Sequence, residues 1–140
     1  MDRRGFLRAV GTVGTVGLGG LAGCSTIAGR GEYDVGMTAA AFDPVEVRVS
    51  VGESVTWRNT SSRGHTVTAY EAQLPEGAAF FATGGYDTEE AARDAFSDDL
   101  GGVISNGDTF SHTFEVPGAH PYFCIPHEQG GMIGTVIVEE

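Results

Sequence analysis

Hydrophobic and polar residues alternate in several short stretches of the chain after residue 44. In VEVRVSV the valines at positions 45, 47, 49 and 51 are separated by polar residues, and SVTWRN (54–59) repeats the pattern after a turn at Gly52-Glu53. A period of two places successive side chains on opposite faces of a strand, so that one face is buried and the other contacts solvent. The same reasoning predicts further strands at residues 65–70, 108–116, 119–124 and 132–139.

Turn-forming residues separate these predicted strands. Several short strands at this spacing are typical of an all-β sandwich or barrel, and a length of 140 residues suits one such domain. The turn signals are the stretch from Ser61 to Gly64 and the pairs Asn106-Gly107, Pro117-Gly118 and Gly130-Gly131.

One long segment, residues 71–102, lacks any alternation. Within it, DTEEAARDAF (87–96) is rich in alanine and predicts a short helix. Asp87 is placed to cap the free amides of the first turn, and Glu90 follows it by three residues. We therefore expect one short helix in a long excursion between two strands, and not a second domain.

The first 24 residues resemble an export signal. Arg3 and Arg4 lie in RRGFL, which resembles the twin-arginine signal, and the apolar run at 9–22 is shorter than the roughly 20 residues that a membrane helix needs. LAGC resembles a lipobox, in which Cys24 is lipidated and becomes the new N-terminus. An uncleaved signal anchor is the alternative, and both place the domain on the outer face of the cell membrane. We predict a signal peptide at 1–23, a tether at 24–33 and one domain at 34–140.

The chain is strongly acidic, with a formal net charge of −11 and no lysine. Nucleic-acid binding needs a basic surface, so this class of partner is excluded. The acidic, lysine-free and glycine-rich composition resembles that of proteins from salt-loving archaea. The acidic residues between 87 and 99 are then either a docking patch or a solvated surface, and we favour the solvated surface.

A cysteine, a histidine and a methionine lie close together in YFCIPHEQGGM (122–132), as Cys124, His127 and Met132. Thiolate, imidazole and thioether groups are soft or borderline metal ligands. Two histidines, one cysteine and a weak axial methionine are the signature of blue-copper electron-transfer sites. The stretch lacks one of the two histidines, so the fourth ligand must come from another part of the chain.

Three other histidines are candidates for this fourth ligand. His112 lies within a predicted strand, and His120 lies four residues before Cys124, with Pro121 between them. His65 follows a polar turn at the start of a predicted strand, and strand ends gather at one pole of a sandwich. We choose His65 and keep His120 as the main alternative.

Two other interpretations of these residues do not involve a metal. Cys24 and Cys124 could form a disulfide, as two cysteines in an exported protein often do. Met132 could fill the hydrophobic core. The lipobox at Cys24 and the spacing of Cys124 from His127 and Met132 favour metal binding over both.

Two blocks of sequence carry a resemblance to a known family, FDPVEVRVSVGESVTWRNTSSRGHTV (42–67) and GAHPYFCIPHEQGGMIGTVIV (118–138). They resemble the small blue copper proteins of the plastocyanin type, and most closely halocyanin. The resemblance implies a cupredoxin-like Greek-key β-sandwich or barrel that holds one copper ion. It implies an electron carrier and not an enzyme, with an exported copper-storage or copper-delivery protein as the alternative. The implied copper ligands are His65, Cys124, His127 and Met132.

The resemblance also implies how electrons enter and leave. His127 is expected to reach the surface through an apolar rim, for which Ile125, Pro126 and Ile133 are the candidates. Membrane-bound redox proteins would be the electron donor and acceptor, and a lipid on Cys24 would hold the protein at the membrane. We expect the protein to be a monomer.

The sequence departs from the plastocyanin pattern at two positions near the predicted site. Thr66 stands where plastocyanins usually have asparagine, although its backbone amide is still available to the cysteine sulfur. Phe123 stands where they commonly have tyrosine, which argues against a remote docking site of the plastocyanin kind. Pro126 has no amide hydrogen and therefore cannot donate to the sulfur of Cys124.

Overall fold

The computed structural model describes residues 33–140. The predictions for the signal peptide 1–23, for Arg3 and Arg4 and for lipid attachment at Cys24 lie outside the described residues. The predicted tether, 24–33, lies outside them as well except for its last residue, Tyr33. No helix of the described part is both long enough and apolar enough to cross a membrane.

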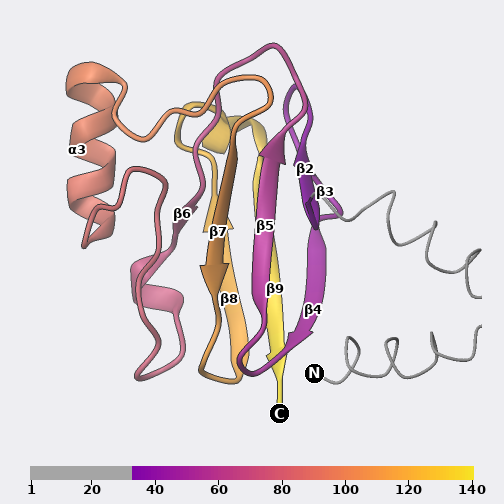
Figure 1. Ribbon diagram of the computed structural model, residues 1–140. Coiled ribbons are helices and arrows are strands. Elements are labelled where there is room, and N and C mark those ends of the chain that lie inside the picture. The colour runs from indigo at the N-terminus through magenta and orange to yellow at the C-terminus, as the bar shows by residue number, and fades with distance from the viewer. Residues whose placement is uncertain (1–32) are drawn as a thin grey trace, which may run out of the picture. The chain divides into compact units, whose positions relative to one another are not determined.

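Two four-stranded sheets pack face to face (Figure 1). One has the order β3-β2-β5-β7 and the other has the order β4-β9-β8-β6. The predicted β-sandwich is therefore confirmed, and the two sheets do not close into a barrel. The strands are β2 (Val35–Met37), β3 (Phe42–Asp43), β4 (Glu46–Ser50), β5 (Ser54–Asn59), β6 (Thr68–Ala69), β7 (Thr109–Thr113), β8 (Gly118–Phe123) and β9 (Ile133–Glu139).

Strands β2 and β3 have no counterpart among the predicted strands. They are three and two residues long, and all three residues of β2 are buried, so they show no alternation. These two strands are defined by their pairing with other segments and not by a local pattern. Strand β2 pairs in parallel with β5, with Val35 opposite Trp57, and antiparallel with β3. A second parallel pair joins β4 to β9, with Val47 opposite Val136.

Aromatic rings from both sheets fill the space between the layers. Trp57 of β5 and Tyr122 of β8 are fully buried, and their rings meet edge to face with centroids 5.2 Å apart. Gly134 of β9 leaves room for Tyr122, because a Cβ atom at this position would lie 2.5 Å from the tyrosine hydroxyl. The predicted alternation of valines holds only within β4, since Val45 and Val51 lie just outside this strand and are exposed.

The long excursion between β6 and β7 contains two helices. They are a 3₁₀ turn, η1 (Glu71–Gln73), and α3 (Glu89–Asp99), which lies beside the sheets in Figure 1. The prediction that Asp87 caps α3 is wrong, because the N-cap is Thr88, whose side chain accepts a hydrogen bond from the amide of Ala91. A hydroxyl in the extended N-cap position satisfies one of the free amides of the first turn.

The predicted strand at 65–70 is shorter than expected. Only Thr68 and Ala69 pair with β8, opposite Phe123 and Tyr122. His65 makes an isolated bridge with Ile104 instead, which comes from the loop between α3 and β7. This bridge joins two loops at the end of the sandwich where β5 finishes.

Candidate metal centre

Three of the four predicted metal ligands come together at one end of the sandwich. His65 lies on the loop that follows β5, while Cys124 directly follows β8 and His127 belongs to the next turn. The ligand atoms of these three residues all lie within 4.8 Å of one another. Within residues 33–140 they are the sole group of three or more histidine, cysteine or acidic donors at such distances.

The sulfur of Cys124 lies between the two imidazoles. Its Sγ atom is 3.5 Å from Nδ1 of His65 and 3.5 Å from Nδ1 of His127. The two imidazole rings are tilted by 54° to each other, with centroids 4.8 Å apart. His65 and Cys124 are fully buried, whereas His127 is partly exposed. The site therefore has a closed inner side and one imidazole that reaches toward solvent.

A short turn, η2 (Ile125–Gly130), carries His127 and returns the chain to β9. The amide of Cys124 donates to the carbonyl of Met132 at 3.1 Å, and the amide of Met132 donates to the carbonyl of His127 at 3.2 Å. Gly131 closes the turn with φ of 94°, a left-handed conformation that glycine adopts without strain. Met132 is fully buried in the same core cluster as Cys124, and its role as the axial ligand stays a prediction.

Buried polar contacts hold His65 in place. Nε2 of His65 and the hydroxyl of Ser61 are 3.0 Å apart, which leaves Nδ1 facing the sulfur. Asn59, at the end of β5 and fully buried, accepts from the amide and the hydroxyl of Ser61, both at 2.9 Å. It also donates to the carbonyls of Arg63 at 2.7 Å and Ile104 at 2.9 Å. A ring fixed at its second nitrogen presents the first in a defined direction.

Backbone groups complete the surroundings of the sulfur. The amide of Thr66 donates to Sγ of Cys124 at 3.4 Å, as expected for the residue that replaces asparagine here. The hydroxyl of Thr66 accepts from the amide of Ile125 at 2.8 Å, which ties the histidine loop to the cysteine loop. Pro126 has no hydrogen to donate.

Burial controls the protonation of all three donors. It raises the pKa of the Cys124 thiol, against the opposing effect of the Thr66 amide. It lowers the pKa of His65, assisted by the nearby His127, and it also lowers the pKa of His127, assisted by the charge of Arg63. The imidazoles are therefore neutral at pH 7, which is the form that binds a metal.

The other two histidines lie away from this site. His120 of β8 is buried, and its Nε2 donates to the carbonyl of Val116 at 2.9 Å. His112 of β7 is half-buried and packs against the ring of Phe114, which also contacts His120. Because His120 is four residues upstream of Cys124 in an extended strand, it lies too far along β8 to share a metal with His65.

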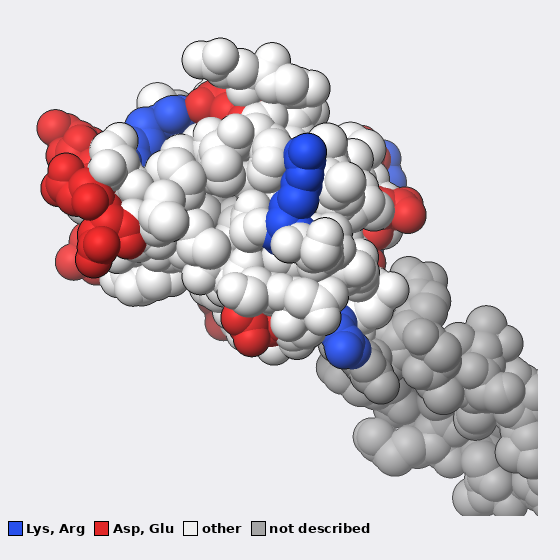
Figure 2. Space-filling model, turned by 90° about the horizontal axis from the view of Figure 1, so that it is seen from above, with Lys and Arg blue, Asp and Glu red and all other residues white. Residues whose placement is uncertain are grey.

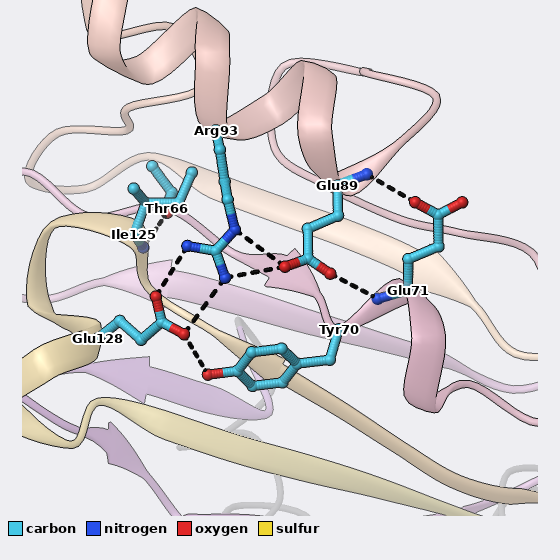
Figure 3. Close-up of polar contacts among 7 residues, drawn as sticks. All are labelled: Thr66, Tyr70, Glu71, Glu89, Arg93, Ile125 and Glu128. Atoms are coloured by element: carbon cyan, nitrogen blue, oxygen red, sulfur yellow. Dashed lines mark hydrogen bonds and ion pairs between the residues drawn. The ribbon is translucent and has the colours of Figure 1, made fainter.

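Charged side chains flank the metal centre on one side. Arg93 of α3 pairs with Glu128 at 2.9 Å and with Glu89 at 2.8 Å, and the hydroxyl of Tyr70 donates to Glu128 at 2.6 Å (Figure 3). The guanidinium of Arg93 holds the pKa of the Glu128 carboxyl below its ordinary value. It also lies 4.3 Å from the ring centroid of Phe123. The sequence pattern does not indicate this network, because its members are up to 58 residues apart.

The donor set has the composition of a copper site. A buried thiol between two neutral imidazoles matches the soft and borderline ligands that copper prefers, and Cys124 forms no disulfide with any described residue. Residues 30–139 match the family described as copper binding proteins, plastocyanin/azurin family. The chain belongs to this family. Its cofactor is copper, and like the plastocyanin-type cupredoxins it is an electron carrier and not an enzyme.

Several known cupredoxins are similar to the chain. A plastocyanin of Scenedesmus fuscus is 32% identical over 101 residues, which cover 72% of this chain and 89% of that protein. A halocyanin of Natronomonas pharaonis is 36% identical over 105 residues, which cover 74% of this chain and 52% of the halocyanin. An oxidised amicyanin variant has 26% identity and a TM-score of 0.55, with coverage of 75% and 79%. The chain thus spans about half the length of several curated relatives.

Proposed function

We propose that this cupredoxin is exported and carries single electrons between membrane-bound redox proteins, through the exposed edge of His127. The observation that supports the proposal is the asymmetry of the site: His65 and Cys124 are fully buried and His127 is partly exposed. When bound, copper supplies the Cu(II)/Cu(I) couple. The imidazole of His127 is then the donor group that a partner can approach.

The protein supplies a site that needs little rearrangement. Ser61 and Asn59 hold the ring of His65, and Thr66 holds both the sulfur of Cys124 and the amide of Ile125. Hydrogen bonds that exist before an electron arrives keep the donors in place while the charge changes. Such preorganisation favours rapid electron exchange over slow uptake and release of a metal.

The face around His127 suits short-range contact with a partner. Figure 2, which views the molecule from the end of the metal centre, shows a face that is mostly uncharged, with a basic side chain near its middle and acidic side chains gathered on the side of α3. Pro126 and Ile133 are exposed there and Ile125 is half-buried. By contrast, Phe123, the other neighbour of Cys124, is fully buried beneath Arg93 and Tyr70. The apolar rim at Ile125, Pro126 and Ile133 is the better port.

High salt strengthens the case for apolar docking. The screening length falls to about 3 Å at 1 M salt, so the acidic residues of α3 act only on direct contact. If the acidic composition reflects a salty habitat, association depends on burial of the rim around His127. Steering by the charge of α3 is then a minor contribution.

The proposed location rests on the sequence before the described domain. RRGFL and LAGC support export by the twin-arginine route and lipid attachment at Cys24. Replacing Cys24 by serine should release the domain from the membrane or leave its precursor uncleaved. Wild-type protein found entirely soluble outside the cell would contradict the anchor.

Electrochemistry and partner kinetics test the function together. Copper-loaded protein should be deep blue and show a fast, reversible one-electron couple, and Cys124→Ala should abolish both while the domain stays folded. A storage or delivery protein would instead release copper readily and show a slow or irreversible couple. Ile125→Asp should slow electron transfer to the native partner in molar salt, whereas Asp98→Asn with Asp99→Asn should hardly change the rate. The reverse result would move the port to the acidic face.

A further inference from the structure

Arg93 reaches from helix α3 to the chain on both sides of the metal-binding segment. Its Nη1 atom pairs with Oε1 of Glu128 at 2.9 Å, and Nη2 lies 3.3 Å from Oε2 of the same carboxylate. Its guanidinium carbon lies 4.3 Å from the centre of the Phe123 ring. Phe123 directly precedes Cys124, and Glu128 directly follows His127. One side chain therefore contacts both neighbours of the segment 124–127.

A second set of contacts fixes Arg93 itself. Its Nε and Nη2 atoms bind Glu89 on the same helix, at 2.9 and 2.8 Å. The carboxylate of Glu89 accepts from the amide of Glu71, and the carboxylate of Glu71 accepts from the amide of Glu89, both at 2.9 Å (Figure 3). These hydrogen bonds join the start of the excursion to the first turn of α3. Glu89 therefore fixes the guanidinium of Arg93 on the side away from Glu128.

Tyr70 completes the contact with the metal loop, residues 124–132. Its ring stacks on Phe123 with centroids 4.3 Å apart, and its hydroxyl donates to Glu128 at 2.6 Å. The side chains of Arg93 and Glu128 are 38% and 26% exposed, so their ion pair is less screened than a surface pair. Phe123 and Glu128 each have two independent contacts, one from Arg93 and one from Tyr70.

The regular structure of the metal loop is limited to one short 3₁₀ helix, η2. The amides of His127 and Met132 donate at 3.2 Å, near the long end of the usual range, and Gly130 and Gly131 lie between these two residues. A turn with few strong bonds and two glycines is easily deformed. The contacts from Arg93 of α3 and from Tyr70 hold its outer side.

We propose that Arg93 is a positioning residue for the metal loop, which holds Cys124 and His127 in their ligand geometry from outside the metal centre. The proposal goes beyond electron transfer, since it concerns the loop even without metal. The proposal gives helix α3 a role in the site, because the excursion that contains α3 stabilises the metal loop. A planar guanidinium suits this role because it binds a carboxylate with two nitrogens and stacks on a ring at the same time.

The test compares Arg93→Met with Arg48→Met. Arg48 is a matched control, because it also pairs with two glutamates, Glu46 at 3.2 Å and Glu139 at 2.9 Å, but lies on β4. Hydrogen exchange of the His127 and Met132 amides in the copper-free protein is the first readout. Arg93→Met should speed exchange at both amides by about tenfold or more, with the amides of β9 unchanged. Arg48→Met should leave the His127 and Met132 amides as in wild type.

The visible and electron paramagnetic resonance spectra of the copper-loaded variants are the second readout. Arg93→Met should broaden or shift the spectrum. The spectrum of Arg93→Lys should be intermediate between those of Arg93→Met and wild type, because lysine keeps the positive charge but loses the two-nitrogen contact with the carboxylate and the stacking on the ring. Equal exchange rates in Arg93→Met and Arg48→Met, or a uniform increase over all amides, would overturn the proposal. A spectrum that is normal in Arg93→Met would overturn it too. Absence of a blue form in the wild type would instead refute the copper function.

Discussion

Asn59→Asp should damage the fold and the metal centre together, although it changes one atom of the side chain. Asn59 is fully buried, and its amide nitrogen donates to the carbonyls of Arg63 and Ile104 at 2.7 and 2.9 Å. A carboxylate has no hydrogen to donate, so one of its oxygens would face two carbonyl oxygens at these distances. The other oxygen would still accept from Ser61, as the asparagine oxygen does.

The size of the effect follows from these contacts. Each of the two lost hydrogen bonds lowers the free energy of unfolding by about 0.5 to 1.5 kcal/mol, and an unpaired buried charge lowers it by several kcal/mol more. Stronger acceptance from the two donors of Ser61 offsets part of this. We expect the free energy of unfolding to fall by about 3 to 5 kcal/mol at pH 7, a large fraction of the 5 to 15 kcal/mol that is usual for a domain.

Denaturant unfolding of the copper-free domain measures this loss. Asn106→Asp is the matched control, because Asn106 is exposed and donates a single hydrogen bond, to the carbonyl of Ser61. Asn106→Asp should cost less than about 1 kcal/mol. Asn59→Asp should also weaken the blue colour of copper-loaded protein, since Ser61 orients His65. A loss no larger than that of Asn106→Asp would refute the reasoning.

Two further predictions concern β8 and β9. Gly134→Ala should lower the free energy of unfolding by about 1 to 3 kcal/mol, because the new methyl group would overlap the buried ring of Tyr122; Gly130→Ala, which has open space, is the control and should be nearly neutral. His120→Gln should leave the blue site intact and reduce the loss of stability on acidification. Burial lowers the pKa of His120, so the unfolded chain binds more protons below about pH 6.5 and wild-type stability falls with pH there. Equal pH dependence in both proteins, measured by denaturant unfolding between pH 7 and 5, would show that His120 is not responsible.

The sequence by itself determined the fold class and most of the strands. Val47, Val49, Val55 and Trp57 all face the core as their alternation predicts, because the side-chain period of a strand is a local property of the chain. The sequence also predicted that Cys124 and His127 act together as metal ligands, since residues only three apart in a turn lie close together. The capping residue of α3 was misassigned by one position, a typical error where Asp87 and Thr88 are both good caps.

Only the tertiary structure shows how segments that are far apart in the sequence come into contact. His65 and Cys124 are 59 residues apart, and they meet because β5 and β8 end at the same pole of two different sheets. The contacts of Arg93 with Glu128 and Phe123 depend on where a long excursion packs, and no periodicity records that. Local patterns follow from the chemistry of neighbouring residues, whereas contacts between segments follow from packing that involves the whole domain.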